Sequence, residues 1–444
     1  MATLQAITGM NDVLPGDARA EGAPVERWRA LEERFRSHAE RHGYREVRTP
    51  LCEYAELFQR GVGEATDIVE KEMYTFEDRG GRTLSLRPEG TASAVRAALE
   101  HSVLARNPVV RWYYVGPMYR AEKPAKGRYR EFFQVGVEVY GDPSPAADAE
   151  VIDLAAGFLR ALGVAQFRVR LNSLGGAGSR QRYRDALVAH FTPVLAELSP
   201  ESQARLARNP LRILDSKDPR DQPFKATAPR VLDHLTDDDR AHFDRVRAFL
   251  DALAVPYEVD HTMVRGLDYY TRTVFELQDA SGSLGAQDSL GGGGRYDNLF
   301  RELGSPTDVP AVGFGLGIER LLMAAPAPAP RKPYRAAVVA ASKDDVAVQA
   351  AALALAKELR DAGVEAHVDT RFGSLKSQMG RANEQLGAAV VLILGGSELA
   401  NGTVTFRDMT REKDDPDKQR PVARAEVAAA VLAHRRATLG EPTP

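Results

Sequence analysis

The sequence contains very little cysteine and no long apolar segment. Cys52 is the only cysteine in 444 residues, which excludes an internal disulfide, a cysteine-based zinc site and an iron–sulfur cluster, and fits a reducing cytosol. We expect Cys52 to be a small buried side chain rather than a catalytic thiol. No apolar run approaches the roughly 20 residues that span a bilayer, and the N-terminus lacks the pattern of a secretory signal. We therefore expect a cytoplasmic protein without a membrane segment.

A strong excess of one charge is also missing. The 59 Lys and Arg residues nearly balance 62 Asp and Glu residues, giving a formal net charge of −3. This total does not indicate a nucleic-acid-binding protein, but nucleic acids can be bound by a local basic patch alone. Net charge therefore leaves that possibility open. The length suggests about three units at roughly 150 residues each.

Residues 324–333, with the sequence AAPAPAPRKP, separate two regions of different pattern. Alternating alanine and proline predict a stiff, extended linker. In residues 334–444, apolar strands alternate with helices, which predicts a compact α/β domain with a mostly parallel sheet. The predicted strands are Arg335–Ala340, Val364–Asp369 and Val390–Leu394, and the predicted helices are Val346–Ala362 and Lys376–Leu386.

Residues 1–323 predict an α+β domain. Apolar residues at helical spacing indicate an amphipathic helix at 25–41. Strands with short connections predict an antiparallel sheet, and a charge-rich stretch at 178–260 predicts a helical insertion. The strands are Tyr44–Arg48, Met73–Phe76, Thr83–Leu86, Val109–Tyr119, Phe132–Tyr140, 263–278 and 311–317, and the insertion is predicted to be helical at Tyr183–Leu198 and Ala241–Leu253.

The segment Phe132–Tyr140 combines an apolar face with a polar one. Because side chains alternate along a strand, three valines share one face, and Gln134, Gly136 and Glu138 share the other. The valine face belongs in a core. The polar face, with a gap between an amide and a carboxylate, suits a small hydrogen-bonding ligand. A half-exposed edge strand is the simpler alternative.

The residues before this strand are strongly basic. Residues 119–130 contain five basic side chains and one acidic one, beginning with Arg120 and Glu122. Arginine has the forked geometry that phosphate oxygens prefer. The segment predicts either a hairpin that faces phosphates or an ordinary solvated turn.

A third segment, AVGFGLGIER at 311–320, places glycines on one strand face. Glycine destabilises a strand interior, so Gly313, Gly315 and Gly317 suggest that something lies flat against bare backbone. A predicted helix, Ile318–Met323, then carries Arg320 in its first turn, where phosphate is favoured. The pattern is neither a Walker A loop nor G-x-G-x-x-G. It predicts a nucleotide surface built from a strand and arginines.

Three more segments, RPEGT at 87–91, RGLDYY at 265–270 and SLGGGGRYD at 289–297, are weak signals individually. Together with the others they resemble class II aminoacyl-tRNA synthetases, specifically the histidyl-tRNA synthetase family. GYREVRTP resembles motif 1, YRAEKPAKGRYREFFQ motif 2 and GFGLGIER motif 3, while RGLDYY and SLGGGGRYD resemble the two histidine-specific signatures. GMNDVLP, LRILDSK, RFGSLKSQMGRAN and ELANGTVT also match, so the resemblance covers essentially the whole chain. Phe133 stands where the family often has histidine, and Asn298 where glycine is common, but neither removes a group with an assigned role.

The resemblance implies a class II antiparallel sheet flanked by helices, with a helical insertion and a C-terminal α/β anticodon-binding domain. It implies that histidine is activated by ATP to histidyl-adenylate and transferred to tRNA(His), releasing pyrophosphate and AMP. It assigns catalysis to Arg120 and Arg265, and histidine binding to Glu89, Gly90, Thr91, Arg120, Gln134, Glu138, Arg265, Tyr269 and Tyr270. It assigns ATP binding to Arg120, Glu122, Phe132, Gly315, Gly317 and Arg320, and tRNA binding to Lys123, Lys126, Arg128 and Arg130.

The resemblance also implies Mg²⁺ with ATP and a homodimer with Pro50 at its interface. The sequence shows no dedicated metal-ligand cluster. We expect no editing domain, because a pocket that bonds both imidazole nitrogens discriminates without one. Arg371, Lys376 and Arg381 lie on or beside one predicted helix of the anticodon-binding domain. One alternative is the catalytically inactive, synthetase-like regulatory subunit of ATP phosphoribosyltransferase, which typically lacks the C-terminal domain and has eroded motifs. A stand-alone RNA-binding module is another. The intact motifs favour the enzyme over both.

Overall fold

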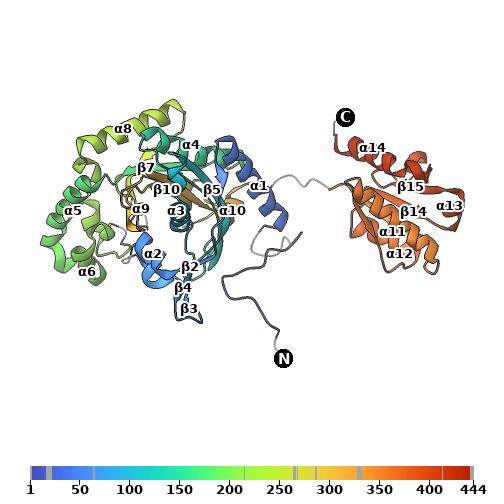
Figure 1. Cartoon of the computed structure of the whole chain (residues 1–444), viewed down its shortest axis with the longest axis horizontal. Helices are drawn as coiled ribbons and strands as arrows, with labels where there is room; N and C mark the ends of the chain where they lie inside the picture. Colours follow the sequence, from blue (N-terminus) through green and yellow to red (C-terminus); the bar gives the residue numbers. More distant parts are fainter. Residues whose placement is uncertain are drawn as a thin grey trace. The chain divides into compact units, whose positions relative to one another are not determined.

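The structure is a computed structural model. It describes residues 3–16, 23–63, 66–214, 216–263, 267, 269–285, 288–327, 333–412 and 414–440. The chain divides into two compact units, Met1–Ala327 and Pro328–Pro444, and their boundary falls within the predicted linker (Figure 1). Each unit has its own hydrophobic core. Among the described helices, none is both long and apolar enough to cross a membrane.

The first unit is built on an eight-stranded sheet with the order β1–β5–β6–β11–β10–β9–β7–β8. Its central pairs are antiparallel, and only the edge pairs β1–β5 and β7–β8 are parallel. The α+β prediction is therefore confirmed. The strands are β1 (Arg45–Glu46), β5 (Val110–Tyr119), β6 (Glu131–Tyr140), β7 (Phe167–Ser173), β8 (Glu258–Val259), β9 (Thr271–Asp279), β10 (Ser289–Arg295) and β11 (Ala311–Gly317).

One face of this sheet carries the main core. The valines of β6 pack there with Phe275 and Phe314, as their alternation predicts. The covering helices are α1 (Val25–Arg41), α4 (Pro145–Ala161), α8 (Asp237–Ala252) and α10 (Ile318–Ala324). The predicted helix 25–41 is confirmed with the same bounds. Helix α4, which the sequence analysis missed, begins at a Ser144 cap followed by Pro145.

The opposite face carries α3 (Thr91–Glu100) near a small sheet of order β2–β4–β3. Its strands are β2 (Cys52–Tyr54), β3 (Thr75–Glu77) and β4 (Thr83–Leu86), and α2 (Ala55–Val62), a π-helical turn (Ile68–Glu72), a 3₁₀ turn (Val103–Ala105) and α9 (Leu299–Glu302) lie in the same unit. The prediction that β3 and β4 join the main sheet was wrong, because both edges of β5 are occupied by β1 and β6.

The helical stretch after β7 has two structural parts. The first comprises α5 (Ala177–Phe191), α6 (Pro200–Arg208), α7 (Gln222–Ala226) and the 3₁₀ turns Thr192–Glu197, Pro210–Ile213 and Val231–His234. These elements share a small core of their own, whereas α8 packs into the main core through Phe243, Val246 and Leu250. The predicted helix through Leu198 is shorter because Pro193 enters a 3₁₀ turn after Phe191.

The second unit is a five-stranded sheet of order β13–β12–β14–β15–β16. The strands are β12 (Arg335–Ala340), β13 (Glu365–Val368), β14 (Val390–Leu394), β15 (Thr403–Asp408) and β16 (Gln419–Ala423). The helices are α11 (Val346–Asp361), α12 (Leu375–Glu384), α13 (Gly396–Asn401) and α14 (Val427–Leu439), with 3₁₀ turns at Pro416–Lys418 and Arg424–Glu426. The first three strands are parallel as predicted, but β15 and β16 are antiparallel, because the connections after β14 are too short for crossovers.

Candidate active site

The polar face of β6 carries a fully buried carboxylate, Glu138. Its Oε1 accepts hydrogen bonds from Thr91 Oγ1 at 2.7 Å and from the Tyr114 hydroxyl at 3.3 Å. Its Oε2 accepts a hydrogen bond from the Tyr296 hydroxyl. Burial raises the pKa of Glu138 to about 8, because a low-dielectric environment disfavours the charged form. Glu138 is therefore mostly protonated at neutral pH.

A second buried carboxylate, Glu89, lies at the N-terminus of α3. It accepts hydrogen bonds from the backbone N–H of Thr91 at 2.7 Å and of Ala92 at 2.8 Å. Burial raises its pKa, although the helix amides and Arg120 act in the opposite direction. Thr91 joins the two carboxylates, since its amide bonds Glu89 while its hydroxyl bonds Glu138. Within the described residues, neither carboxylate forms an ion pair with a basic side chain.

Glycines give this cluster its space. A Cβ atom on Gly136 would overlap the Tyr114 ring and lie 2.8 Å from the Phe314 carbonyl oxygen, and one on Gly90 would approach the same ring at 2.5 Å. A Cβ atom on Gly313 would overlap the Glu138 carboxylate. The prediction of bare backbone along the whole glycine face of β11 was wrong at Gly313, because the protein's own side chain covers it.

Tyrosines complete the surroundings of the carboxylates. Tyr269 and Tyr270 are both buried, with ring centroids 4.7 Å apart, and Tyr269 lies 5.5 Å from the Tyr296 ring. The structure thus brings the predicted Glu89, Thr91, Glu138 and Tyr269 together. Tyr114 and Tyr296 were missed as pocket residues. Tyr296 lies inside the SLGGGGRYD segment, which was a usable signal.

Three arginines, Arg120, Arg128 and Arg320, concentrate positive charge in the same unit. Arg120 donates from Nε to the Pro88 carbonyl at 2.9 Å, and its guanidinium lies 5.3 Å from the centroid of the Phe132 ring. Arg320 donates to the carbonyl oxygens of Gly127 and Ser289, each at 2.7 Å. Burial lowers the pKa of Arg320, and the positive charges of Arg128 and Arg120 lower it further. Such a cluster favours a polyanionic ligand.

The remaining predicted residues are distributed as follows. Arg265 lies outside the described residues. Gln134 is half-buried on the polar face of β6, with its side-chain amide close to Gly315. Lys123, Lys126 and Arg128 are exposed on the hairpin loop that follows β5, and Arg130 is half-buried. Arg128 pairs with Glu122.

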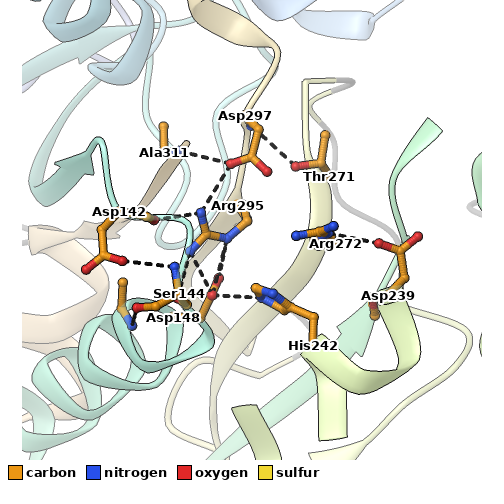
Figure 2. A network of polar contacts seen from close by, with 12 residues as sticks. Asp142, Ser144, Asp148, Asp239, His242, Thr271, Arg272, Arg295, Asp297 and Ala311 are labelled. Carbon is orange, nitrogen blue, oxygen red and sulfur yellow. Dashed lines mark hydrogen bonds and ion pairs between the residues drawn. The ribbon is translucent and has the colours of Figure 1, made fainter. Parts of the chain in front are cut away.

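A second polar network, in the same unit, holds the segment around Tyr296 (Figure 2). The fully buried Arg295 donates from Nη2 to Asp148 at 2.9 Å and from Nη1 to Asp297 at 3.2 Å. Asp148 also contacts His242 Nε2 at 3.0 Å. Burial opposes ionisation of Asp148, but Arg295 and His242 outweigh it and lower the pKa of Asp148. Asp297 accepts the Ala311 N–H at 3.0 Å, so both neighbours of Tyr296 are fixed.

The second unit contains a cavity of about 390 Å³ beside β12, β13 and α12. Its lining includes Arg371, Gln378, Arg381 and Gln385. Arg371 and Arg381 both pair with Asp369, which also lines the cavity, while Lys376 is exposed on α12. The volume is within the usual range of ligand pockets.

Comparisons with known proteins cover both units. The family model described as "Histidyl-tRNA synthetase" matches residues 9–321, and the one described as "Anticodon binding domain" matches residues 335–434. A "Histidine--tRNA ligase" from Sorangium cellulosum is 53% identical over 435 residues, covering 97% of this chain and 96% of the relative. One from Thermosynechococcus vestitus is 48% identical over 407 residues, covering 91% and 92%. The solved apo histidyl-tRNA synthetase of S. aureus superposes with a TM-score of 0.79 at 33% identity, covering 97% of this chain and 100% of that one.

Proposed function

Because the chain belongs to the histidyl-tRNA synthetase family, we propose that Glu89 and Glu138 bind the imidazole end of the substrate histidine. The chain catalyses the ligase reaction of that family, in which histidine is activated with ATP and transferred to tRNA. The observation that carries the site assignment is the pair of buried carboxylates joined through Thr91. Imidazole offers two ring nitrogens, and each can exchange a hydrogen bond with such groups.

Specificity follows from the same burial. Another amino acid of similar size could not make the hydrogen bonds that imidazole would make to Glu89 and Glu138, at a cost of about 1–3 kcal/mol for each group. A site that requires several such bonds can discriminate by roughly 10⁴–10⁵ without an editing reaction. This supports the expectation that histidine selection occurs in the synthetic site itself.

We propose that the arginines perform the activation step by alignment and charge neutralisation. A carboxylate oxygen of histidine forms a bond to the α-phosphorus of ATP, and the bond from that phosphorus to the bridging oxygen breaks, releasing pyrophosphate. Arg120 and Arg265 would stabilise the five-coordinate phosphorus, and Arg320 the leaving pyrophosphate. Glu122 and Phe132 would frame the adenine. A ribose hydroxyl of tRNA then attacks the histidyl carbonyl, and AMP leaves.

Magnesium fits this site through ATP rather than through a protein cage. Within the described part of the chain, no group of three or more His, Cys, Asp or Glu side chains is arranged to hold a metal. Glu122 and Glu276 are half-buried, and their charges act on Arg320. We propose that Mg²⁺ is held chiefly by phosphate oxygens, as is usual for this ion. When bound, it would neutralise phosphate charge.

For tRNA, we propose contacts by the exposed loop residues Lys123, Lys126 and Arg128 with the acceptor end, and by the domain 334–444 with the anticodon. The cavity lined by Arg371 and Arg381 is suited to one unpaired base, because its lining combines hydrogen-bonding side chains with apolar ones such as Val338. The Ala/Pro linker at 324–333 then separates the catalytic core 1–323 from this domain.

The division of labour is tested by truncating the chain after Ala329. The unit Met1–Ala327 has its own core, so the fragment should retain histidine-dependent ATP–pyrophosphate exchange. Its charging of tRNA should fall steeply. A folded fragment that charges tRNA normally would contradict the anticodon assignment. If the full-length chain itself showed no histidine-dependent ATP–pyrophosphate exchange, the result would instead favour the regulatory-subunit alternative.

We also propose a homodimer, of about 97 kDa (2 × 48.5). Three large apolar side chains in or next to the small sheet that follows Pro50 are exposed: Leu51 is 44% exposed, Tyr54 53% and Phe76 47%. Exposed apolar side chains that gather in one region are typical of an interface. Light scattering should give the dimer mass for the wild type, and Phe76→Glu should shift it towards the monomer. A monomeric wild type at micromolar concentration would contradict the proposal.

A further inference from the structure

The N-terminal segment is an exposed arm that touches the protein at a tight turn. Residues 3–8 are exposed, whereas Gly9 and Met10 are half-buried. The Met10 N–H donates to the Ile7 carbonyl at 2.9 Å, which closes the turn Ile7–Met10. This turn lies against residues 121–130, which we call the ATP loop.

Two kinds of hydrogen bond join the turn to the ATP loop. The Gly9 carbonyl accepts the N–H of Arg130 at 2.7 Å and that of Glu131 at 3.2 Å. The Arg130 side chain donates from Nη1 to the Thr8 carbonyl and from Nε to the Glu122 carbonyl, both at 3.2 Å. Arg130 therefore ties the arm to both limbs of the loop.

Only a residue without a side chain fits at the contact point. Gly9 has a φ of +88°, in the left-handed region that favours glycine. A Cβ atom there would lie 2.7 Å from Pro124 Cγ and 3.1 Å from Arg130 Cγ. The arm thus approaches the loop more closely than any other residue would allow.

The tip of the ATP loop is held separately. Arg320 donates to the Gly127 carbonyl at 2.7 Å, and Lys126 Nζ donates to the Ser283 carbonyl at 3.2 Å. The arm consequently acts at the base of the loop, where Glu122 and Phe132 lie on the two limbs of the hairpin. These are the two residues assigned to adenine.

We propose that the turn Ile7–Met10 is a positioning element for ATP binding, which sets the base of the ATP loop through Gly9 and Arg130. This inference rests on the proposed assignment of Glu122 and Phe132, at the base of the loop, to the adenine of ATP. It gives the arm a role in the activation step that is exerted through its contacts with the loop. Arg130 then acts through the loop backbone rather than as a free charge for tRNA.

The test compares Gly9→Val with Gly16→Val in the full-length chain. Gly16 also has a positive φ, +65°, but a Cβ atom there meets nothing within 4 Å. Gly9→Val should raise the KM for ATP about fivefold or more, the ratio that corresponds to one lost hydrogen bond, and leave the KM for histidine within about twofold. Trypsin should cleave after Lys126 and Arg128 several-fold faster, since proteolysis follows local opening. Gly16→Val should match the wild type in both measurements.

A second variant, Arg130→Lys, separates position from charge. Lysine keeps the positive charge that a tRNA phosphate needs but loses the fork that joins Thr8 and Glu122. It should reproduce the faster cleavage and the higher KM for ATP. Wild-type cleavage rates in both Gly9→Val and Arg130→Lys would overturn the proposal. Faster cleavage with an unchanged KM for ATP would uphold the positioning of the loop and contradict the assignment of the loop to ATP.

Discussion

Two fully buried carboxylates in the same unit, Asp148 and Glu138, have opposite environments. Asp148 is paired with Arg295 and His242 (Figure 2), and its pKa is lowered. Glu138 is surrounded by hydroxyl groups instead, and its pKa is raised to about 8. A carboxylate with its own cation is electrostatically complete. Among the described residues Glu138 has hydroxyl partners but no cation, so its carboxyl group keeps the capacity to share a proton with a ligand.

The two sites are mechanically connected. Arg295 and Asp297 flank Tyr296, whose hydroxyl reaches Glu138. The network of Arg295, Asp148 and His242 therefore holds Tyr296, one of the donors to Glu138, in position. The comparison predicts that disturbing Asp148's partners affects folding first, whereas disturbing Glu138 affects histidine first.

The largest effect is expected for Arg295→Met. It removes the charge while keeping much of the side-chain volume, and leaves Asp148 buried with His242 alone. Breaking a buried ion pair on one side costs about 3–5 kcal/mol. Urea denaturation followed by tryptophan fluorescence measures this cost in the relevant unit, because Trp28 and Trp112 are the only tryptophans and both lie in it.

The matched control for that variant is Arg301→Met. The Arg301–Asp308 pair is exposed, with 60% of the arginine side chain accessible. Its loss should cost less than about 1 kcal/mol. Equal losses in Arg295→Met and Arg301→Met would contradict the structural role of the Arg295–Asp148 pair.

The second effect concerns Glu138→Gln. Glutamine keeps an acceptor oxygen and nearly the same shape, and the carboxyl it replaces is mostly neutral at pH 7. Stability should therefore change by less than about 1 kcal/mol, while kcat/KM for histidine in pyrophosphate exchange falls about 10- to 100-fold, as for one or two lost hydrogen bonds. If Glu138→Gln loses stability but activates histidine normally, Glu138 has a structural role like that of Asp148 and does not bind histidine.

The smallest effect is expected for Tyr296→Phe. It removes one of the three hydroxyl donors to Glu138 found among the described residues and leaves the buried ring in place. The KM for histidine should rise about fivefold, equivalent to roughly 1 kcal/mol, with the KM for ATP unchanged. Parallel changes in both constants would indicate a general distortion of the unit rather than a role in the histidine pocket.

Much of the fold was predictable where local pattern decides structure. The apolar runs of β11, β12 and β14 begin and end at the predicted residues, as does helix α1. Helix α4 was missed because it is buried on most sides, so its apolar residues lack helical spacing. The placement of β3 and β4 failed for another reason: strand pairing depends on which edges are free, and sequence alternation does not reveal this.

The sequence of β6 alone predicted which side chains of the site share a face. It did not predict which residues of other elements surround them. Alternation on β6 placed Glu138 on the polar face, and the structure confirms this placement. Tyr114 lies opposite Gly136 in the β5–β6 register, and this pairing is a tertiary property. The glycine at 313 was interpreted as space for a ligand, whereas it makes space for the Glu138 carboxylate. The residue types therefore predicted where space and polar groups would lie. Which side chain fills each space could be learned only from the folded structure.

The most direct test of the Glu138 assignment is the number of protons taken up when histidine binds. The pKa of Glu138, about 8, lies above the roughly 4.3 of a free glutamate, so free enzyme holds this proton at pH 7 and loses most of it by pH 9. In the complex, the imidazole of histidine and the carboxyl group of Glu138 together hold one proton.

Titration calorimetry in buffers of different ionisation enthalpy measures the number of protons taken up on binding. The amino group of histidine contributes equally to this number in the wild type and in Glu138→Gln. We predict that the wild type takes up about one proton more than Glu138→Gln at pH 9 and about the same number at pH 7. Equal uptake by the two proteins at pH 9 would contradict it.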